Sequence, residues 1–201
     1  SATSIAFTPT SGSHDYTSGA YNFKYIISNP REGQEASVST SDTWITGVMD
    51  NNGTVSYTVS RNTTGSSRSG KITVKYGDLS TTFTITQSAA SLTLSSSSAT
   101  CTYASATKSF NLTISNRQSD LAVSVQSDVS WITGVSESNG AVSYTVAENN
   151  SGSSRTGKII VTYAGVSKEF VVTQTYSATS IAFTPTSGSH DYTSGAYNFK
   201  Y

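Results

Sequence analysis

Apolar and polar residues alternate along several short stretches of the chain. Val55, Tyr57 and Val59 alternate with serine and threonine, and similar alternation recurs around residues 21–27, 72–76 and 83–85. A period of two with β-branched and aromatic residues predicts strands that are buried on one face. No stretch of helical length carries an apolar stripe with a period of 3.6 residues. The pattern therefore predicts an all-β protein.

Turn-forming residues separate the predicted strands. They include the strings NNG at residues 51–53, TGSS at residues 64–67 and YGD at residues 76–78. Counting the segments between such turns gives roughly seven or eight strands in about 88 residues. This number and spacing are typical of an immunoglobulin-like β-sandwich.

The strand pattern occurs twice, at a separation of 87 residues. Trp44–Gln87 aligns without gaps with Trp131–Gln174, and 26 of the 44 aligned pairs are identical. We therefore predict two homologous sandwiches, module A at residues 1–88 and module B at residues 89–176. Four residues join Gln87 to Leu92, and this joint contains no proline. So short a joint predicts that adjacent modules touch.

A second, exact repeat lies at the end of the chain. Residues 177–201 match residues 1–25 letter for letter, and a piece of this length is too short to fold alone. We expect it to supply the first strands of another A module in an alternating A-B array. The alternative is that it donates strands to a module of another chain. The joint before it, from Gln174 to Ile181, is two residues longer than the joint between A and B.

Charge and composition narrow the classes of partner. The chain has 12 lysines and arginines, 12 aspartates and glutamates, and 71 serines and threonines among its 201 residues. A net charge of zero gives no basic surface for nucleic acid and no attraction to anionic membranes. No apolar run is long enough to span a bilayer. Because it begins without methionine or a signal peptide, we expect a mature or excised segment.

The sequence offers no constellation for catalysis, so we predict a protein that is not an enzyme and has no cofactor. The two histidines, His14 and His190, are copies of one position, which Cys101 occupies in module B. A position that accepts either residue predicts packing rather than chemistry. No Cys/His spacing suits zinc, and no Asp-rich loop suits calcium. A single cysteine excludes an internal disulfide.

Aromatic and arginine residues are the remaining candidates. We predict that six form the structural core: Trp44, Trp131, Tyr57, Tyr144, Tyr76 and Tyr163. Sugar stacking is the alternative for the tryptophans. Five residues are candidates for a glycan or inter-module contact: Tyr16, Tyr21, Tyr176, Arg68 and Arg155. Among the tyrosines, we expect these three to be more exposed than those of the core, with Tyr176 packed between modules. The arginines could clamp a carboxylate, but we favour contacts to backbone carbonyls or a nearby acid.

Several spaced motifs recur in both modules. They are Ser-Asp shortly before W-I-T-G-V, then V-S-Y-T-V, then N-x-x-G-S-S-R-x-G-K-I-x-V and a final T-Q. Together they resemble the BACON domain, a family named for Bacteroidetes and for carbohydrate binding, over nearly all of A and B. The resemblance implies an extracellular β-sandwich of a Bacteroidetes-type bacterium or its phage, often placed in series as a spacer.

These observations predict a non-catalytic structural segment of an extracellular bacterial fibre, stalk or surface adhesin. Its partners would be neighbouring copies of itself along the fibre, and its location the cell surface or the secreted fraction. Two alternatives stay open. One is a carbohydrate-binding module for glycans or mucins that acts through multivalency. The other is a component of a phage tail or tail fibre.

Overall fold

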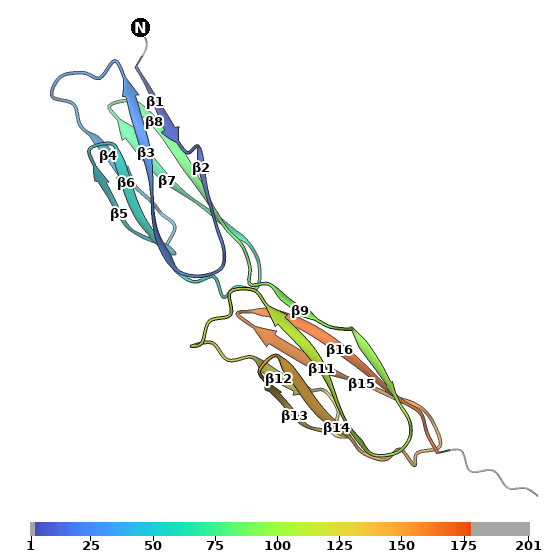
Figure 1. Cartoon of the computed structure of the whole chain (residues 1–201). Helices are drawn as coiled ribbons and strands as arrows, with labels where there is room; N and C mark the ends of the chain where they lie inside the picture. Colours follow the sequence, from blue (N-terminus) through green and yellow to red (C-terminus); the bar gives the residue numbers. More distant parts are fainter. Residues whose placement is uncertain (1–2, 178–201) are drawn as a thin grey trace, which may run out of the picture.

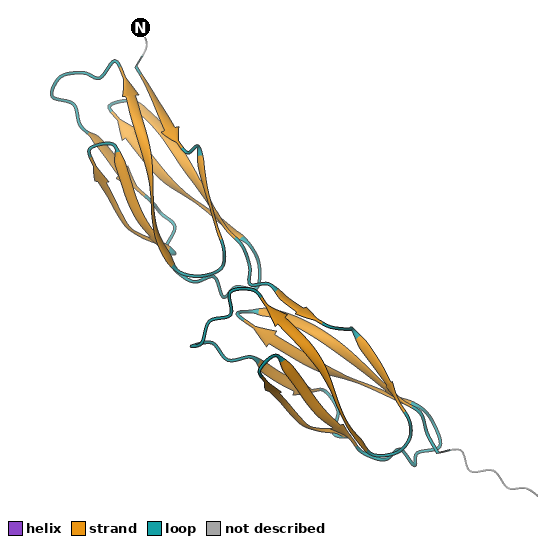
Figure 2. Ribbon diagram, in the orientation of Figure 1, coloured by secondary structure: helices purple, strands orange, loops and turns teal. Residues whose placement is uncertain are grey.

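Two β-sandwiches lie end to end in the computed structural model, which describes residues 3–177 (Figure 1). All sixteen regular elements of the described part are strands, and no helix occurs there (Figure 2). The prediction of an all-β fold is therefore confirmed. The third unit expected at residues 177–201 lies outside the described residues, except for Ser177.

The first sandwich contains eight strands in two four-stranded sheets. The strands are β1 (Ser4–Thr8), β2 (Ser11–His14), β3 (Gly19–Ser28), β4 (Ala36–Ser39), β5 (Ile45–Asn51), β6 (Thr54–Val59), β7 (Arg68–Tyr76) and β8 (Leu79–Gln87). One sheet has the order β1-β3-β6-β5 and the other the order β2-β8-β7-β4. Strand β2 runs parallel to β8, whereas the other pairs are antiparallel. This is the immunoglobulin-like arrangement, with its first strand divided between the two sheets.

The second sandwich repeats this topology strand for strand. Its strands are β9 (Leu92–Leu94), β10 (Ser98–Cys101), β11 (Ala106–Ile114), β12 (Ser124–Ser127), β13 (Ile132–Ser138), β14 (Ala141–Val146), β15 (Arg155–Tyr163) and β16 (Val166–Gln174). The sheet orders are β13-β14-β11-β9 and β10-β16-β15-β12, and β10 is parallel to β16. The period of 87 residues is therefore a period of the fold, and the prediction of tandem immunoglobulin-like sandwiches is confirmed.

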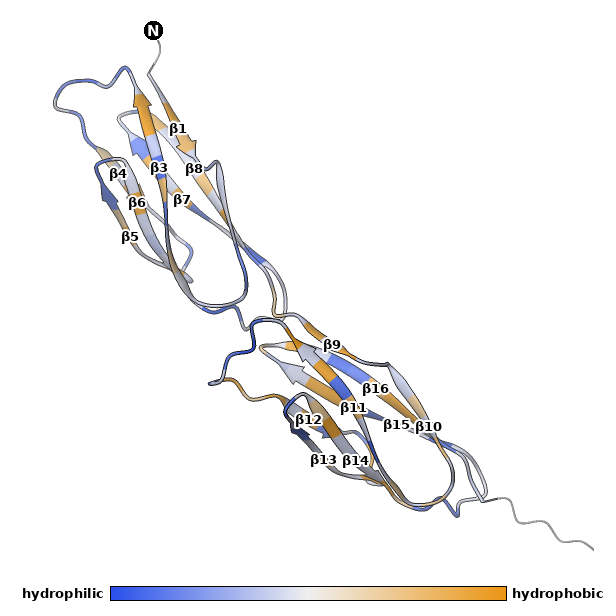
Figure 3. Cartoon of the chain, in the orientation of Figure 1, coloured by the Kyte–Doolittle hydropathy of each residue, from blue (hydrophilic) through white to orange (hydrophobic). Residues whose placement is uncertain are grey.

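Each sandwich is filled by aromatic and β-branched side chains from facing sheets. Phe23 stacks on Phe83 in the first module and Phe110 on Phe170 in the second, both with ring centroids 3.9 Å apart. Apolar residues recur along the strands, while the loops are largely polar (Figure 3). All four tyrosines assigned to the core are buried, namely Tyr57, Tyr76, Tyr144 and Tyr163.

The two tryptophans lie at the rim of the core rather than inside it. Trp44 and Trp131 are only partly buried, and they pack against the core clusters from outside. Each immediately precedes a strand near one end of its sandwich. A Cβ at Gly70 would come 2.8 Å from Trp44, so glycine leaves the space that the indole ring occupies.

Candidate functional site at the module junction

A buried polar cluster closes the end of the first sandwich that faces the second. The side chain of Gln87 is fully buried and donates hydrogen bonds to the carbonyls of Thr17 (2.9 Å) and Ser60 (3.1 Å). Its own carbonyl accepts a hydrogen bond from Nε of Arg68 (2.8 Å). A buried amide must be satisfied in this way to avoid the cost of desolvation. The cluster therefore ties strand β8 to two loops.

Arg68 contributes to the same cluster from the start of β7. Its Nη2 donates to the carbonyl of Ser60 at 2.6 Å, and its guanidinium lies 4.4 Å from the centroid of the Trp44 ring. Burial lowers the pKa of the Arg68 guanidinium from its ordinary value. One face of the indole is therefore covered by arginine, as expected for a cation–π contact.

Asn62 links this cluster to the loop that carries Tyr16. Its fully buried side chain donates to the carbonyls of Ser66 (2.8 Å) and Ser88 (2.9 Å), and accepts from the Thr64 hydroxyl (2.7 Å). Its backbone N–H donates to the carbonyl of Tyr16 at 2.8 Å. The N-x-x-G-S-S-R motif and the terminal glutamine therefore form one hydrogen-bonded unit. In the second module the equivalent residues are Asn149, Gln174, Arg155 and Trp131, with closely similar contacts.

Tyr16 extends from this fixed loop into the second sandwich. It is 2% exposed and belongs to the core cluster of the second module. Its hydroxyl donates to the carbonyl of Asn116 (2.7 Å) and lies 3.0 Å from the hydroxyl of Tyr163. Burial, together with the Tyr163 hydrogen bond, raises the pKa of the Tyr16 hydroxyl. Tyr16 is thus an inter-module contact and not an exposed residue, because the second module covers it.

Polar pairs surround this buried tyrosine. Arg61 of the first module forms two hydrogen bonds to Asp120 of the second, at 2.9 and 3.1 Å. The amide of Asn116 donates to the carboxylate of Asp15 at 2.8 Å. The Arg61 guanidinium lowers the pKa of Asp120, and hydrogen bonds from Thr17 are the main cause of a lowered pKa at Asp15. Both carboxylates therefore accept these hydrogen bonds as anions at neutral pH.

The backbones of the two modules also approach each other closely. A Cβ at Gly65 would overlap the carbonyl of Gly165, and a Cβ at Gly165 would overlap the carbonyl of Thr63 and lie 2.6 Å from the nitrogen of Gly65. Both glycines have a positive φ, +78° and +79°, which other residues adopt at a cost. The junction therefore combines a buried tyrosine, a bidentate ion pair and a glycine–glycine contact.

The remaining candidates lie away from this junction. Tyr21 is half-buried and stacks on His14 with 3.6 Å between the ring centroids. His14 is 2.9 Å from the Tyr57 hydroxyl, and burial lowers the pKa of its imidazole. Cys101, at the same position in the second module, is a buried free thiol. Tyr176 is 42% exposed at the far end of the second module.

Residues 3–177 contain no group of three or more His, Cys, Asp or Glu side chains placed to hold a metal ion. Within the same range, no helix is long and apolar enough to cross a membrane.

Two immunoglobulin-like sandwiches in series define the class of protein, and the family follows from comparison with known sequences. The BACON family model, described as "Putative binding domain, N-terminal", matches residues 34–88 and 121–175. Because the two matches cover more than half of the chain, the chain belongs to the BACON family. This confirms the resemblance seen in the motifs. No curated protein matches the chain in sequence.

Several solved structures show a limited similarity to the chain, at low sequence identity and with TM-scores below 0.5. The I9–I11 tandem from titin has a TM-score of 0.45 at 5% identity, over 87% of this chain and 66% of the titin chain. A chimeric titin Z1Z2-Z1Z2 tandem has a TM-score of 0.38 at 11% identity, over 87% of this chain and all of that one. An endo-fucoidan hydrolase of glycoside hydrolase family 107 has a TM-score of 0.36 at 10% identity, over 87% of this chain. The chain spans only 29% of that hydrolase.

Proposed function

We propose that the chain is a non-catalytic spacer segment of an extracellular bacterial stalk, fibre or surface adhesin. The observation that carries this proposal is the junction between the two sandwiches. Tyr16 of one module is buried in the core cluster of the other, and Arg61 pairs with Asp120 beside it. A tether that lets two domains swing freely has no need of such contacts.

A fixed junction turns a row of modules into a rod of defined length. Each sandwich buries its own apolar residues, so stacking modules adds neighbour interfaces without changing the fold. The numerous serine and threonine side chains supply polar groups for the surface without net charge. Partners of this segment would be further copies of itself along the fibre. A tail fibre of a phage would use the same properties, and labelling of cells and virions with an antibody against the chain separates the two locations.

The rigidity of the junction tests this function directly. Ser56 and Ser109 are exposed on strands of the first and second module, so each can be changed to cysteine and spin-labelled, with Cys101 replaced by serine. Double electron–electron resonance should give one narrow distance distribution. Insertion of four glycine and serine residues between Ala89 and Ala90 supplies the broad reference. A distribution in the unmodified joint as broad as this reference would reject the spacer function.

A glycan-binding role is the second candidate, and a cleft in the first module favours it. The cleft encloses about 420 Å³ and includes Pro9, His14, Tyr21 and Tyr57 in its lining. In the second module, Lys108 stands at the position of Tyr21, so that module lacks the aromatic face that Tyr21 gives this cleft. A glycan array probed with the whole chain tests this role. Binding that is lost in Tyr21→Ala would support it, and an array without binding would reject it.

A further inference from the structure

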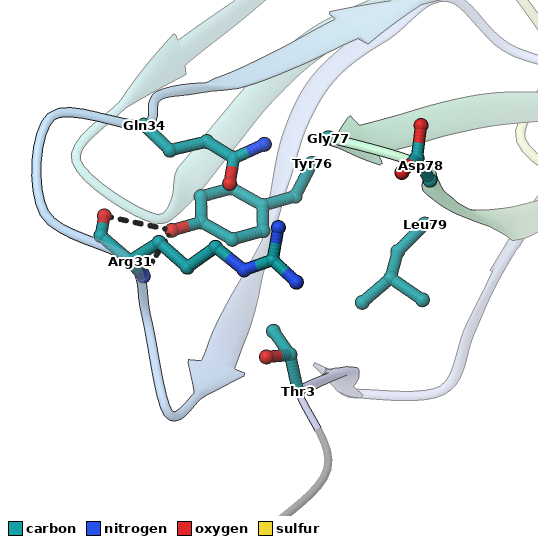
Figure 4. A pocket seen from close by; sticks show the side chains of 7 residues that line it. All are labelled: Thr3, Arg31, Gln34, Tyr76, Gly77, Asp78 and Leu79. Carbon is teal, nitrogen blue, oxygen red and sulfur yellow. Dashed lines mark hydrogen bonds between the residues drawn. The ribbon is translucent and has the colours of Figure 1, made fainter.

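The outer end of the first module has the same architecture as the surface that receives Tyr16. A pocket of about 210 Å³ lies there, lined by Thr3, Arg31, Gln34, Tyr76, Asp78 and Leu79 (Figure 4). The Tyr76 hydroxyl accepts a hydrogen bond from the backbone N–H of Arg31 at 2.6 Å. In the second module, the Tyr163 hydroxyl accepts one from the backbone N–H of Gln118 at 2.8 Å. Tyr76 therefore occupies the position of the tyrosine that contacts Tyr16.

The outer end of the second module has the architecture of the end that carries Tyr16. Tyr103 corresponds to Tyr16, and its carbonyl accepts a 2.8 Å hydrogen bond from the backbone N–H of Asn149, as that of Tyr16 does from Asn62. Tyr16 is 2% exposed, whereas Tyr103 is 42% exposed. The loop geometry is thus present at both ends, but in the described part of the chain Tyr103 has no neighbouring module to cover it.

The charged residues at these ends differ between the two modules. Arg61 of module A faces Asp120 of module B across the junction. In module B the residue at the position of Arg61 is Glu148, which is exposed, and module A carries the exposed Arg31 beside its pocket. A contact from B to A would therefore bring Glu148 towards Arg31, with opposite charges. A contact from A to A would bring Arg61 towards Arg31, and one from B to B would bring Glu148 towards Asp120. Like charges disfavour the contact from B to B. In module A the exposed Glu32 follows Arg31 and Asp78 lines the same pocket, so charge alone does not exclude the contact from A to A.

We propose that the Arg31–Tyr76 pocket is the acceptor for the outer end of module B of the preceding copy, with Tyr103 against Tyr76 and Glu148 near Arg31. This inference rests on the spacer function, since it names the partner of a second type of junction. Residues 177–201 repeat residues 1–25, so an A-type sequence follows module B along the same polypeptide.

The second junction is wider than the first. Module A has Asp78 where module B has Gly165, and a Cβ at Gly165 would overlap the carbonyl of Thr63. Because Asp78 carries a Cβ, the backbones of B and A must lie further apart at this point than those of A and B do. The joint from B to A is two residues longer than the joint from A to B, which adds up to about 7 Å of reach. The same modules in the order A–A, joined by the short linker, would lack that reach.

The test uses a chain of two consecutive copies of residues 1–176. Spin labels at Ser109→Cys in the first copy and Ser56→Cys in the second copy report on the junction from B to A, with Cys101→Ser in both copies. We expect one narrow distance distribution. Arg31→Glu in the second copy should broaden it, Glu148→Arg in the first copy should broaden it as well, and the two changes together should restore the narrow width. Tyr103→Ala in the first copy should broaden it without rescue by either charge change.

Labels at Ser56 and Ser109 within one copy provide the matched control, because they report on the junction from A to B. These labels should give the same narrow distribution in every variant. A broad distribution from B to A beside a narrow one from A to B would overturn the inference and leave the spacer function standing. A distance distribution from B to A that stays equally narrow in the charge-reversal variants and in Tyr103→Ala would also overturn the inference. Broad distributions at both junctions would reject the spacer function itself.

Discussion

Replacement of Tyr16 by alanine is the sharpest test of the junction, because the chain contains its own reference. Tyr103 occupies the corresponding position and makes the corresponding backbone contact, but it is 42% exposed against 2% for Tyr16. A tyrosine side chain offers roughly 200 Å², so the neighbouring module removes about 80 Å² of Tyr16 from water. At about 25 cal/mol per Å², this burial contributes about 2 kcal/mol.

The hydroxyl adds to this value. It donates to the carbonyl of Asn116 and contacts the hydroxyl of Tyr163, which together contribute about 1 kcal/mol. Tyr16→Ala should therefore lower the free energy of unfolding of the second module by about 2–3 kcal/mol more than Tyr103→Ala does. Tyr16→Phe should retain most of the burial and lose only the hydroxyl contribution.

Scanning calorimetry of the whole chain measures the effect. For a domain of this size, each kcal/mol corresponds to about 4–8 °C in Tm, so the transition of the second module should fall by about 10–20 °C. The distance distribution between labels on Ser56 and Ser109 should broaden in the same variant. Equal effects of Tyr16→Ala and Tyr103→Ala would show that the second module gains nothing from the tyrosine, and the reasoning would be refuted.

Three further perturbations probe the junction and the polar cluster. Gly165→Ala should separate the modules and broaden the distance distribution, whereas Gly152→Ala, also at positive φ but with open space around it, should cost only about 1 kcal/mol of backbone strain. Asn149→Ala should lower the unfolding free energy by about 2–4 kcal/mol in a denaturant titration because it leaves buried carbonyls unpaired, while the exposed Asn150→Ala should change it by less than about 0.5 kcal/mol. The pKa of Asp120 is lowered in the folded chain, so its contribution to the junction is present above about pH 4 and is lost as the pH falls below that value. A distance distribution between labels on Ser56 and Ser109 that stays narrow at pH 2 and in high salt would contradict this role of the ion pair.

Most of the fold follows from local pattern. The alternation of Val55, Tyr57 and Val59 with hydroxyl side chains is enough to place β6 with its apolar face in the core. Successive side chains of a strand point to opposite faces of the sheet, so the apolar set faces the core and the hydroxyl set faces away from it. The repeat of 87 residues then fixes the number of sandwiches, and the spacing of tryptophan, asparagine, arginine and glutamine indicates the family. The position of the tryptophans does not follow from this pattern, since a residue that precedes a strand can lie either within the core or at its rim.

The junction could not be predicted from one module alone. Tyr16 and Tyr103 are the same residue at the same position of the two modules, and only the neighbouring sandwich makes one buried and the other exposed. The signal that could have found the contact is the difference between modules. Arg61 in module A is replaced by Glu148 in module B, and Gly33 stands where Asp120 stands. Positions at which otherwise similar modules differ in charge are candidates for contacts between them.

The parallel pairing of β2 with β8 gives each module a particular response to mechanical load. In the described part, the chain enters the first module at its outer end and leaves the second module at the opposite end (Figure 1). Tension applied between these ends would draw β2 and β8 in opposite directions along their common axis. Ser11–His14 faces Thr84–Gln87, and the hydrogen bonds of this pairing lie across the direction of pull. They are therefore loaded together in shear and must fail together, whereas a hairpin pulled from its open end unzips one bond at a time. Strands β10 and β16 repeat this clamp in the second module.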